Sequence, residues 1–303
     1  MRILVTGIAG FIASNIASEL IRKGHKVIGI DDLSNGKKLN IPKKCKFYKI
    51  NLIDKNKLQK INSKIDQIFH LAGQSSGEKS FESPIEDLEK NTISTLNLIN
   101  FAISKKVKKF IFASSQSVYG DVKNISINEK YITNPLSCYG NSKLSSENYL
   151  KIFKDKLPYV IFRINNVYGY GQDLENLKQG MVSIYLAQAL KKNNILVKGS
   201  LNRFRDFVHI NDVIDCWLKA SLKSNIKNIT FNLGTGKKTY VKDILKIIKS
   251  NLKNIKIIKS KSTPGDQRGI YMNNKLIKSK LNKKSFIPIK TGLKELIFKY
   301  KNL

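Results

Sequence analysis

The chain of 303 residues is long enough for one large α/β domain and a smaller second lobe, and 41% of its residues are hydrophobic, as in ordinary globular proteins. It enters a strand-like apolar run at once, and no stretch reaches about 18 apolar residues, so we expect neither a signal peptide nor a membrane span. Three cysteines without a CxxC or metal-ligand spacing predict reduced thiols, no metal site and a cytoplasmic location; they are Cys45, Cys138 and Cys216.

The formal net charge of +33 would suit a protein that binds nucleic acid or another polyanion. The lysines, however, are spread along the whole chain among many Asn and Ile residues, and arginine, on which nucleic-acid sites usually depend, is rare. We therefore interpret the charge as a solvated lysine surface that helps to attract an anionic substrate, and we expect no nucleic-acid partner. A polyanion-binding basic protein stays open as a non-enzymatic alternative.

Strand and helix patterns alternate regularly along the first half of the chain. The expected elements are strand 2–6, helix 11–23, strands 26–30, 47–50 and 67–72, helix 84–105, strand 109–114, helix 139–154 and strand 159–164. This alternation predicts an α/β protein with a Rossmann-type, doubly wound parallel sheet.

From about residue 166 the pattern loosens. The expected elements there are helix 181–192, strands 195–198 and 205–210, helix 211–222, strand 228–233 and helices 241–252 and 291–301. We therefore expect a dinucleotide-binding Rossmann domain over residues 1–166, rejoined by about 207–235, and a smaller substrate-binding lobe over residues 167–303.

A glycine-rich turn between the first strand and the first helix predicts a dinucleotide site. Gly7 and Gly10, in the segment GIAGFIA, allow a tight turn and the close approach of a pyrophosphate, which the helix N-terminus can then bind. Asp31 ends the second strand, where a carboxylate can bind both ribose hydroxyls and repels a 2′-phosphate, so we predict NAD and not NADP. Ala72 and Gly73, which end the fourth strand, are small enough to admit the nucleotide.

The spacing of Tyr139 and Lys143 on a predicted helix places both side chains on one face, where an ammonium can lower the pKa of a phenol and make it a usable base. Two further YxxxK matches begin at Tyr119 and Tyr271, so the motif alone is weak. Tyr139 differs from these two in its position, because Ser115 ends a strand 24 residues before it. In a doubly wound sheet, such a strand end and the following helix meet at the edge where ligands bind.

Ten segments carry a resemblance to the extended short-chain dehydrogenase/reductase family, in its nucleotide-sugar epimerase/dehydratase branch. They are VTGIAGFIASN, DDLSNG, HLAGQSS, NTISTLNLI, FIFASSQSVYG, YGNSK, RINNVYG, RFRDFVHINDV, FNLGTG and TPGDQRGIY. The resemblance covers nearly the whole chain, and several of the segments in its C-terminal part are specific to enzymes that act on sugar nucleotides.

The resemblance implies roles for individual residues. Bound NAD would contact Gly7, Gly10, Phe11, Ile12, Asp31, Asn51, Leu52, Leu71, Ala72, Gly73, Asn91, Tyr139 and Lys143. The catalytic residues would be Ser115, Tyr139 and Lys143. The UDP-sugar or other nucleotide-sugar substrate would contact Ser115, Ser117, Tyr139, Asn166, Val182, Arg205 and Arg268.

Three positions depart from the family pattern. Asn51 stands where the family has an adenine-contacting Asp, and Ser94 stands where the long helix has a Gly. Thr263 replaces a second phosphate-binding Arg, for which Arg268 is the candidate substitute.

The triplet after the fifth strand bears on the type of reaction. Dehydratases of this branch have Thr-Asp-Glu there, because elimination of water needs an acid and a base, whereas this chain has Ser115, Gln116 and Ser117 and therefore resembles the 4-epimerases. We predict an NAD-dependent epimerase of the UDP-glucose/galactose type, acting at C4 of a nucleotide-activated hexose, N-acetylated or uronic forms included, through a transient 4-keto sugar.

Other interpretations share these motifs. An NAD(P)-dependent reductase of a keto-sugar nucleotide and a dehydratase remain the enzymatic alternatives, and an inactive NAD-sensing member of the family is a third. Family habit also predicts a homodimer, formed through the helices that contain Asn91 and Tyr139.

Overall fold

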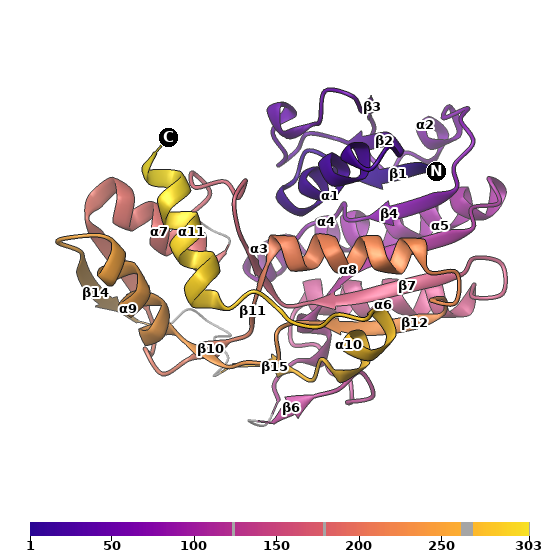
Figure 1. Cartoon of the computed structure of the whole chain (residues 1–303). Helices are drawn as coiled ribbons and strands as arrows, with labels where there is room; N and C mark the ends of the chain where they lie inside the picture. The colour runs from indigo at the N-terminus through magenta and orange to yellow at the C-terminus, as the bar shows by residue number, and fades with distance from the viewer. Residues whose placement is uncertain (123–124, 178–179, 262–268, 303) are drawn as a thin grey trace. The chain divides into compact units, whose positions relative to one another are not determined.

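The computed structural model describes residues 1–122, 125–177, 180–261 and 269–302. The chain divides into two units (Figure 1). The first unit contains residues 1–120, 132–163 and 214–231, and the second contains those described residues that fall within 121–131, 164–213 and 232–303. None of the helices in the described ranges is long and apolar enough to span a lipid bilayer.

A seven-stranded sheet has the order β12-β7-β5-β4-β1-β2-β3, and its pairings from β3 through β5 are parallel. The strands are β1 (Arg2–Thr6), β2 (Lys26–Asp31), β3 (Lys46–Lys49), β4 (Gln67–His70), β5 (Lys109–Ser115), β7 (Tyr159–Ile164) and β12 (Ile229–Leu233). The chain leaves β1 toward β2 and β3 on one side and returns to β4 on the other, so the order reverses between β1 and β4. This confirms the predicted doubly wound sheet, and ligands bind such sheets at the carboxyl ends beside the reversal.

Helices cover both faces of this sheet. They are α1 (Phe11–Arg22), α2 (Lys55–Gln59), α3 (Gly77–Glu82), α4 (Pro84–Leu88), α5 (Ser94–Ser104), α6 (Cys138–Ile152) and α8 (Ile210–Leu222), with short turns η1 (Lys38–Asn40), η2 (Glu89–Ile93) and η3 (Gln116–Tyr119). Trp217 of α8 packs against Phe69 and Phe162, with ring centroids 5.4 Å away in both cases. Ile68, whose side chain alternates with Phe69 along β4, instead joins a core cluster with Leu98 of α5 and residues of α6.

The second unit has its own apolar core among three helices and short strands. Its elements are β6 (Ser126–Ile127), β8 (Asn166–Tyr168), α7 (Met181–Lys192), β9 (Asn194–Lys198), β10 (Phe204–Arg205), β11 (Phe207–His209), β13 (Thr239–Tyr240), α9 (Val241–Asn251), β14 (Lys256–Ser260), β15 (Tyr271–Met272), α10 (Lys275–Leu281) and α11 (Ile289–Lys301). Helices α7, α9 and α11 lie near one another (Figure 1). Leu186, Ile248 and Leu293 join them in one buried cluster. Strand β9 pairs in parallel with β14 beside them.

Two expected elements differ from the structure. The predicted helix 84–105 is divided into α4, the π-helical turn η2 and α5, which hydropathy cannot reveal because the apolar face continues through all three. The predicted strand 205–210 is two short strands, β10 and β11, separated at Asp206, whose buried carboxylate accepts hydrogen bonds from the backbone of Thr235, Gly236 and Met272.

A buried ion pair fixes α6 to the sheet. Glu147 on α6 is fully buried and accepts bonds of 2.9 and 2.7 Å from Nε and Nη2 of Arg163 on β7. Its Oε1 also accepts a 2.6 Å hydrogen bond from the hydroxyl of Ser114 on β5, and Arg163 Nη1 donates to the Tyr119 hydroxyl in η3 at 2.8 Å. One carboxylate and one guanidinium thus connect four elements.

Glu147→Ala leaves the Arg163 guanidinium buried without its counter-ion, and loss of one partner of a buried pair costs about 3–5 kcal/mol. We expect the free energy of unfolding, measured by urea denaturation, to fall by that amount. The matched control is Glu19→Ala, which removes an ion pair with the exposed Arg22 and should produce a much smaller change. Equal losses in the two variants would contradict the assignment of Glu147 as the anchor of α6.

Candidate active site

The turn after β1 has the geometry of an anion-binding loop. Gly7 has φ +69°, its N–H donates to the Ile30 carbonyl at 2.8 Å, and a Cβ placed on it would lie 2.8 Å from the backbone nitrogen of Ala72. Gly10 is the N-cap of α1 and, within the described chain, no side chain caps the first N–H groups of that helix. Phe11 begins α1 and is half-buried. Free N–H groups and the positive end of the helix dipole therefore face the turn.

Asp31 is placed at the end of β2 beside this loop. It is 8% exposed; Oδ2 accepts from the Ala9 N–H at 3.0 Å and Oδ1 from the Leu33 N–H at 2.8 Å. Burial raises the pKa of Asp31, and these two backbone hydrogen bonds oppose that rise. Each carboxylate oxygen accepts one bond here and can accept a further one. Asn51, by contrast, is exposed and bonds the Ile53 N–H with its own side chain.

The neighbouring strand end is held by a buried polar chain. The Thr6 hydroxyl accepts from the N–H groups of Leu71 and Ala72, both at 3.2 Å, and lies 2.7 Å from His70 Nδ1. His70 Nε2 lies 2.8 Å from the hydroxyl of Thr95 on α5, and burial holds the pKa of His70 well below its usual range. His70 is thus a structural link that positions residues 71–73. Leu52, which precedes α2, is buried and its carbonyl accepts from the Asn97 side chain.

Four of the predicted residues meet at the end of β5 and the start of α6. Ser137 caps α6 through its hydroxyl, which accepts from the Gly140 N–H at 3.1 Å, and so the first turn contains Tyr139. The Tyr139 hydroxyl is hydrogen-bonded to Ser115, and the hydroxyls of Ser115 and Ser117 are 3.1 Å apart. Lys143 follows one turn later, 4% exposed, with Nζ 5.9 Å from the Tyr139 ring centroid.

Burial opposes the charged forms of both helix residues. It raises the pKa of Tyr139 to about 12, which the hydrogen bond with Ser115 partly offsets and the negative charge of Asp87 adds to. It lowers the pKa of Lys143 to about 8, and here the charge of Asp87 acts in the opposite direction. A further positive charge in the site would lower the pKa of Tyr139 and so favour its phenolate.

Sequence reasoning did not identify Asp87 as part of this site. It lies on α4, four residues before Asn91 in η2, and its Oδ1 accepts from Asn91 Nδ2 at 2.9 Å and from Gln74 Nε2 at 2.8 Å. Asn91 Oδ1 is buried without a hydrogen-bond partner among the described residues, and it lies so close to Gly73 that a Cβ there would clash with it. The signal was present in the i, i+4 spacing of an acid and an amide on one helical face.

Three of the predicted substrate-contacting residues, Asn166, Val182 and Arg205, belong to the second unit. Asn166 begins β8 and Arg205 ends β10, and the two are linked because the Asn166 N–H donates to the carbonyl of Asp206 at 3.3 Å. Arg205 Nη1 donates to the Phe204 carbonyl at 2.8 Å. Val182 is buried in the first turn of α7. Arg268, and Thr263 with it, lie outside the described residues.

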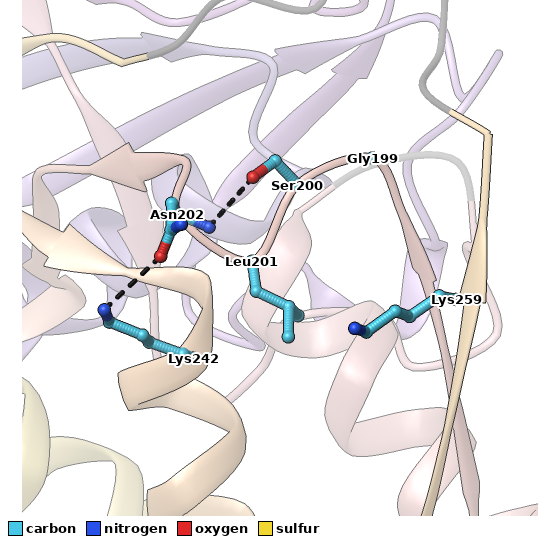
Figure 2. A pocket seen from close by; sticks show the side chains of 6 residues that line it. All are labelled: Gly199, Ser200, Leu201, Asn202, Lys242 and Lys259. Carbon is cyan, nitrogen blue, oxygen red and sulfur yellow. Dashed lines mark hydrogen bonds between the residues drawn. The ribbon is translucent and has the colours of Figure 1, made fainter.

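A hollow in the second unit contains none of the predicted residues (Figure 2). It is lined by the turn after β9 and by Lys242 and Lys259, and Lys242 Nζ donates to Asn202 Oδ1 at 3.3 Å. The residues that line it include no carboxylate, phenol or imidazole, so we do not place the chemistry there. Over the described ranges, no three His, Cys, Asp or Glu side chains are grouped so as to hold a metal ion.

The chain matches a family model and named relatives over most of its length. Residues 3–234 match a family model described as "NAD dependent epimerase/dehydratase family". The chain is 37% identical to a protein of Methanocaldococcus jannaschii named "Putative UDP-glucose 4-epimerase", over 99% of this chain and 98% of the relative.

Solved structures are similar over their full length. A UDP-glucose 4-epimerase of Thermotoga maritima with UDP-glucose has a TM-score of 0.95 at 33% identity, covering 100% of this chain and 99% of the other. A Thermus thermophilus UDP-glucose 4-epimerase in complex with NAD has a TM-score of 0.91 at 27% identity, covering 99% of both chains.

Gly7→Ala tests the loop. The added Cβ would come within 2.8 Å of the Ala72 nitrogen, and alanine disfavours φ +69°, so the loop must move away from β4. We expect the affinity for NAD, measured by calorimetry, to fall at least about tenfold, since two displaced N–H contacts are worth roughly 1.4 kcal/mol or more.

Gly24→Ala is the matched control. Gly24 also has a positive φ, +81°, but a Cβ there would meet no atom within 4 Å. This variant should lose about 1–2 kcal/mol of stability and keep its NAD affinity. An unchanged affinity in Gly7→Ala would refute the placement of the dinucleotide at this turn.

Proposed function

The chain belongs to the NAD dependent epimerase/dehydratase family, and we propose that it is an NAD-dependent 4-epimerase of a nucleotide-activated hexose of the UDP-glucose/galactose type. The observation that carries the proposal is the cluster in which Ser115 bonds the Tyr139 hydroxyl beside the buried Lys143. The cluster lies at the carboxyl end of β5, which is one strand away from the point between β1 and β4 where the strand order reverses.

The residues of the first unit fit NAD. A Cβ on Gly7 would clash with the backbone of Ala72 and one on Gly73 with Asn91 Oδ1, so glycine at both positions lets the two strand ends lie close together. Asn91 Oδ1 is a buried acceptor without a partner in the described chain. Asp31 keeps spare acceptor capacity for ribose hydroxyls and would repel a 2′-phosphate. We propose that the cofactor is held by the full predicted set: Gly7, Gly10, Phe11, Ile12, Asp31, Asn51, Leu52, Leu71, Ala72, Gly73, Asn91, Tyr139 and Lys143.

The residues of the chain supply binding and proton transfer. Tyr139 as the phenolate accepts the proton of the sugar C4 hydroxyl at its Oη, and later returns it from the same atom. Lys143 stabilises the phenolate electrostatically, and the Ser115 hydroxyl bonds the reacting sugar oxygen. NAD, when bound, supplies reversible acceptance of the C4 hydride and a positive charge near Tyr139. Inversion of C4 would require the 4-keto sugar to turn over in the site between the two proton transfers at Tyr139.

The position after Ser115 favours epimerisation over dehydration. Gln116 begins η3 with Ser117, so the two positions present an amide and a hydroxyl. Neither group is acidic enough to protonate a leaving hydroxyl, which elimination of water requires. A dehydratase is therefore less well supported than an epimerase. A keto-sugar reductase is the other enzymatic alternative, and this position does not bear on it.

For the substrate we propose that Asn166 and Arg205 contact the diphosphate, with Val182 near the nucleotide and Arg268 as a second cation. Arg is suited to this role because its fork of donors matches a phosphate. A diphosphate that links nucleoside and sugar would also gain from the overall charge of +33.

Tyr139→Phe removes the proton acceptor and should lower kcat by roughly 10²–10⁴, the usual contribution of a general base. The melting temperature should remain close to wild type, because the ring stays in place. Tyr149→Phe, on the same helix but packed against the apolar cluster, is the control that should keep its activity. Turnover retained by Tyr139→Phe would contradict the role of Tyr139 as the general base.

Incubation of the protein with a panel of nucleotide sugars distinguishes an epimerase from a dehydratase and a reductase. The configuration at C4 is followed by NMR, with and without added NAD. We expect C4 inversion of UDP-glucose or UDP-N-acetylglucosamine without net oxidation or reduction of the cofactor. Loss of one water, seen by mass spectrometry, would indicate a dehydratase, and stoichiometric oxidation of NADH with a 4-keto sugar would indicate a reductase.

We also propose that the chain forms a homodimer through α4 and α6. Ile85 and Leu88 of α4 and Ile152 of α6 are 67%, 41% and 69% exposed, and apolar side chains exposed on two contacting helices suit a second copy of the chain. Ile85→Lys should shift the mass measured by light scattering from dimer toward monomer. A monomeric wild-type protein would end this part of the proposal.

A further inference from the structure

Among the described residues, Asp87 is the carboxylate that lies beside the catalytic pair and that the proposed reaction does not use. It is 1% exposed. Its Oδ1 accepts from Gln74 Nε2 and Asn91 Nδ2, whereas Oδ2 is buried and has no hydrogen-bond partner in the described part of the chain. A buried carboxylate is costly, and an asparagine could accept the same two bonds at lower cost, so packing and hydrogen bonding alone do not account for the charge.

Lys143 is the buried cation of the same cluster. Its Nζ lies 3.3 Å from where a Cβ on Gly73 would be, and Asn91 Oδ1 lies closer still to that same point. Lys143, Gly73, Asn91 and Asp87 are therefore contiguous, and they connect α6, the end of β4, η2 and α4. Lys143 is itself 4% exposed, so its ammonium needs an opposite charge that water does not screen.

We propose that Asp87 is a positioning residue of the active site, which holds the Asn91 amide with its oxygen toward Gly73 and keeps Lys143 protonated by its negative charge. The effect of the Asp87 charge on Lys143 is electrostatic and does not depend on which sugar is turned over. Only its consequence for catalysis rests on the proposed function. The role is indirect, because Asp87 acts through Asn91 and Lys143.

The sign of the effect follows from the groups that face Asp87. A negative charge raises the pKa of every acid near it, so it keeps Lys143 protonated to higher pH and delays ionisation of Tyr139. His70 on β4 faces Lys143 but is neutral, because burial and the charge of Lys143 hold its pKa far below the usual value. Glu86, on the same helix as Asp87, is instead paired at the surface with Lys79 and Lys90.

Asp87→Asn keeps one side-chain acceptor and removes the charge. In protein labelled with ¹³C at lysine Cε and free of sugar, Lys143 should titrate near pH 8, and its resonance is assigned by its loss in Lys143→Met. We expect the midpoint in Asp87→Asn to fall by about half a pH unit or more. The acidic limb of the pH profile of kcat belongs to Tyr139 and the basic limb to Lys143. Because Asp87 raises both pKa values, both limbs should move to lower pH in Asp87→Asn.

Glu86→Gln and Asp87→Glu are the matched control variants. Glu86→Gln neutralises the adjacent surface carboxylate and should leave the Lys143 midpoint in place. Asp87→Glu retains the charge and should hold the midpoint near wild type even where the longer side chain disturbs Asn91. A midpoint unchanged in folded Asp87→Asn, or lowered equally in Asp87→Glu, overturns the proposal. Absence of epimerase activity in the wild type would instead refute the proposed function and leave the titration result standing.

Discussion

The active site depends on the buried pair between Glu147 and Arg163. Glu147 follows Lys143 by one helical turn, so the bond that fixes its carboxylate also fixes the rotation of α6 about its axis. The same carboxylate accepts from Ser114, the residue before Ser115, and Arg163 reaches Tyr119 at the end of η3. The helix with the base and the strand with the assisting hydroxyl are thereby held in one register. The desolvation cost of the pair is offset only because every one of these bonds is made.

The catalytic residues lie at buried positions, where their charged, reactive forms are disfavoured. Burial disfavours the Tyr139 phenolate and the Lys143 ammonium alike. The chain offsets each with a separate group: a hydrogen bond from Ser115 for the tyrosine, and the charge of Asp87 for the lysine. Asp87 raises the pKa of the tyrosine as well, so ionisation of Tyr139 near neutral pH needs a further positive charge nearby, as a bound nicotinamide would supply.

Much of this could be predicted from the sequence, and the failures have physical causes. The sheet followed from alternating apolar runs, and Tyr139 was distinguished from Tyr119 and Tyr271 by its place after a strand end. The structure shows why the others differ: Tyr119 is buried and accepts a hydrogen bond from Arg163, while Tyr271 is on a short strand, β15. Hydropathy could not reveal the turn η2, since a π turn changes the hydrogen-bond spacing and leaves the apolar face intact.

Asp87 escaped prediction because its partners come from distant segments. Gln74 follows β4, and Lys143 lies on α6, so a sequence pattern shows only the spacing to Asn91. The structure adds that Asp87 Oδ2 and Asn91 Oδ1 are both buried without partners in the described chain, at about 1–3 kcal/mol for each unpaired group. A fold selected for stability alone would replace such atoms with apolar ones. Under the proposed role, Asp87 is retained for its charge toward Lys143 and Asn91 for the oxygen that it holds at Gly73, so stability is given up for the arrangement of the site.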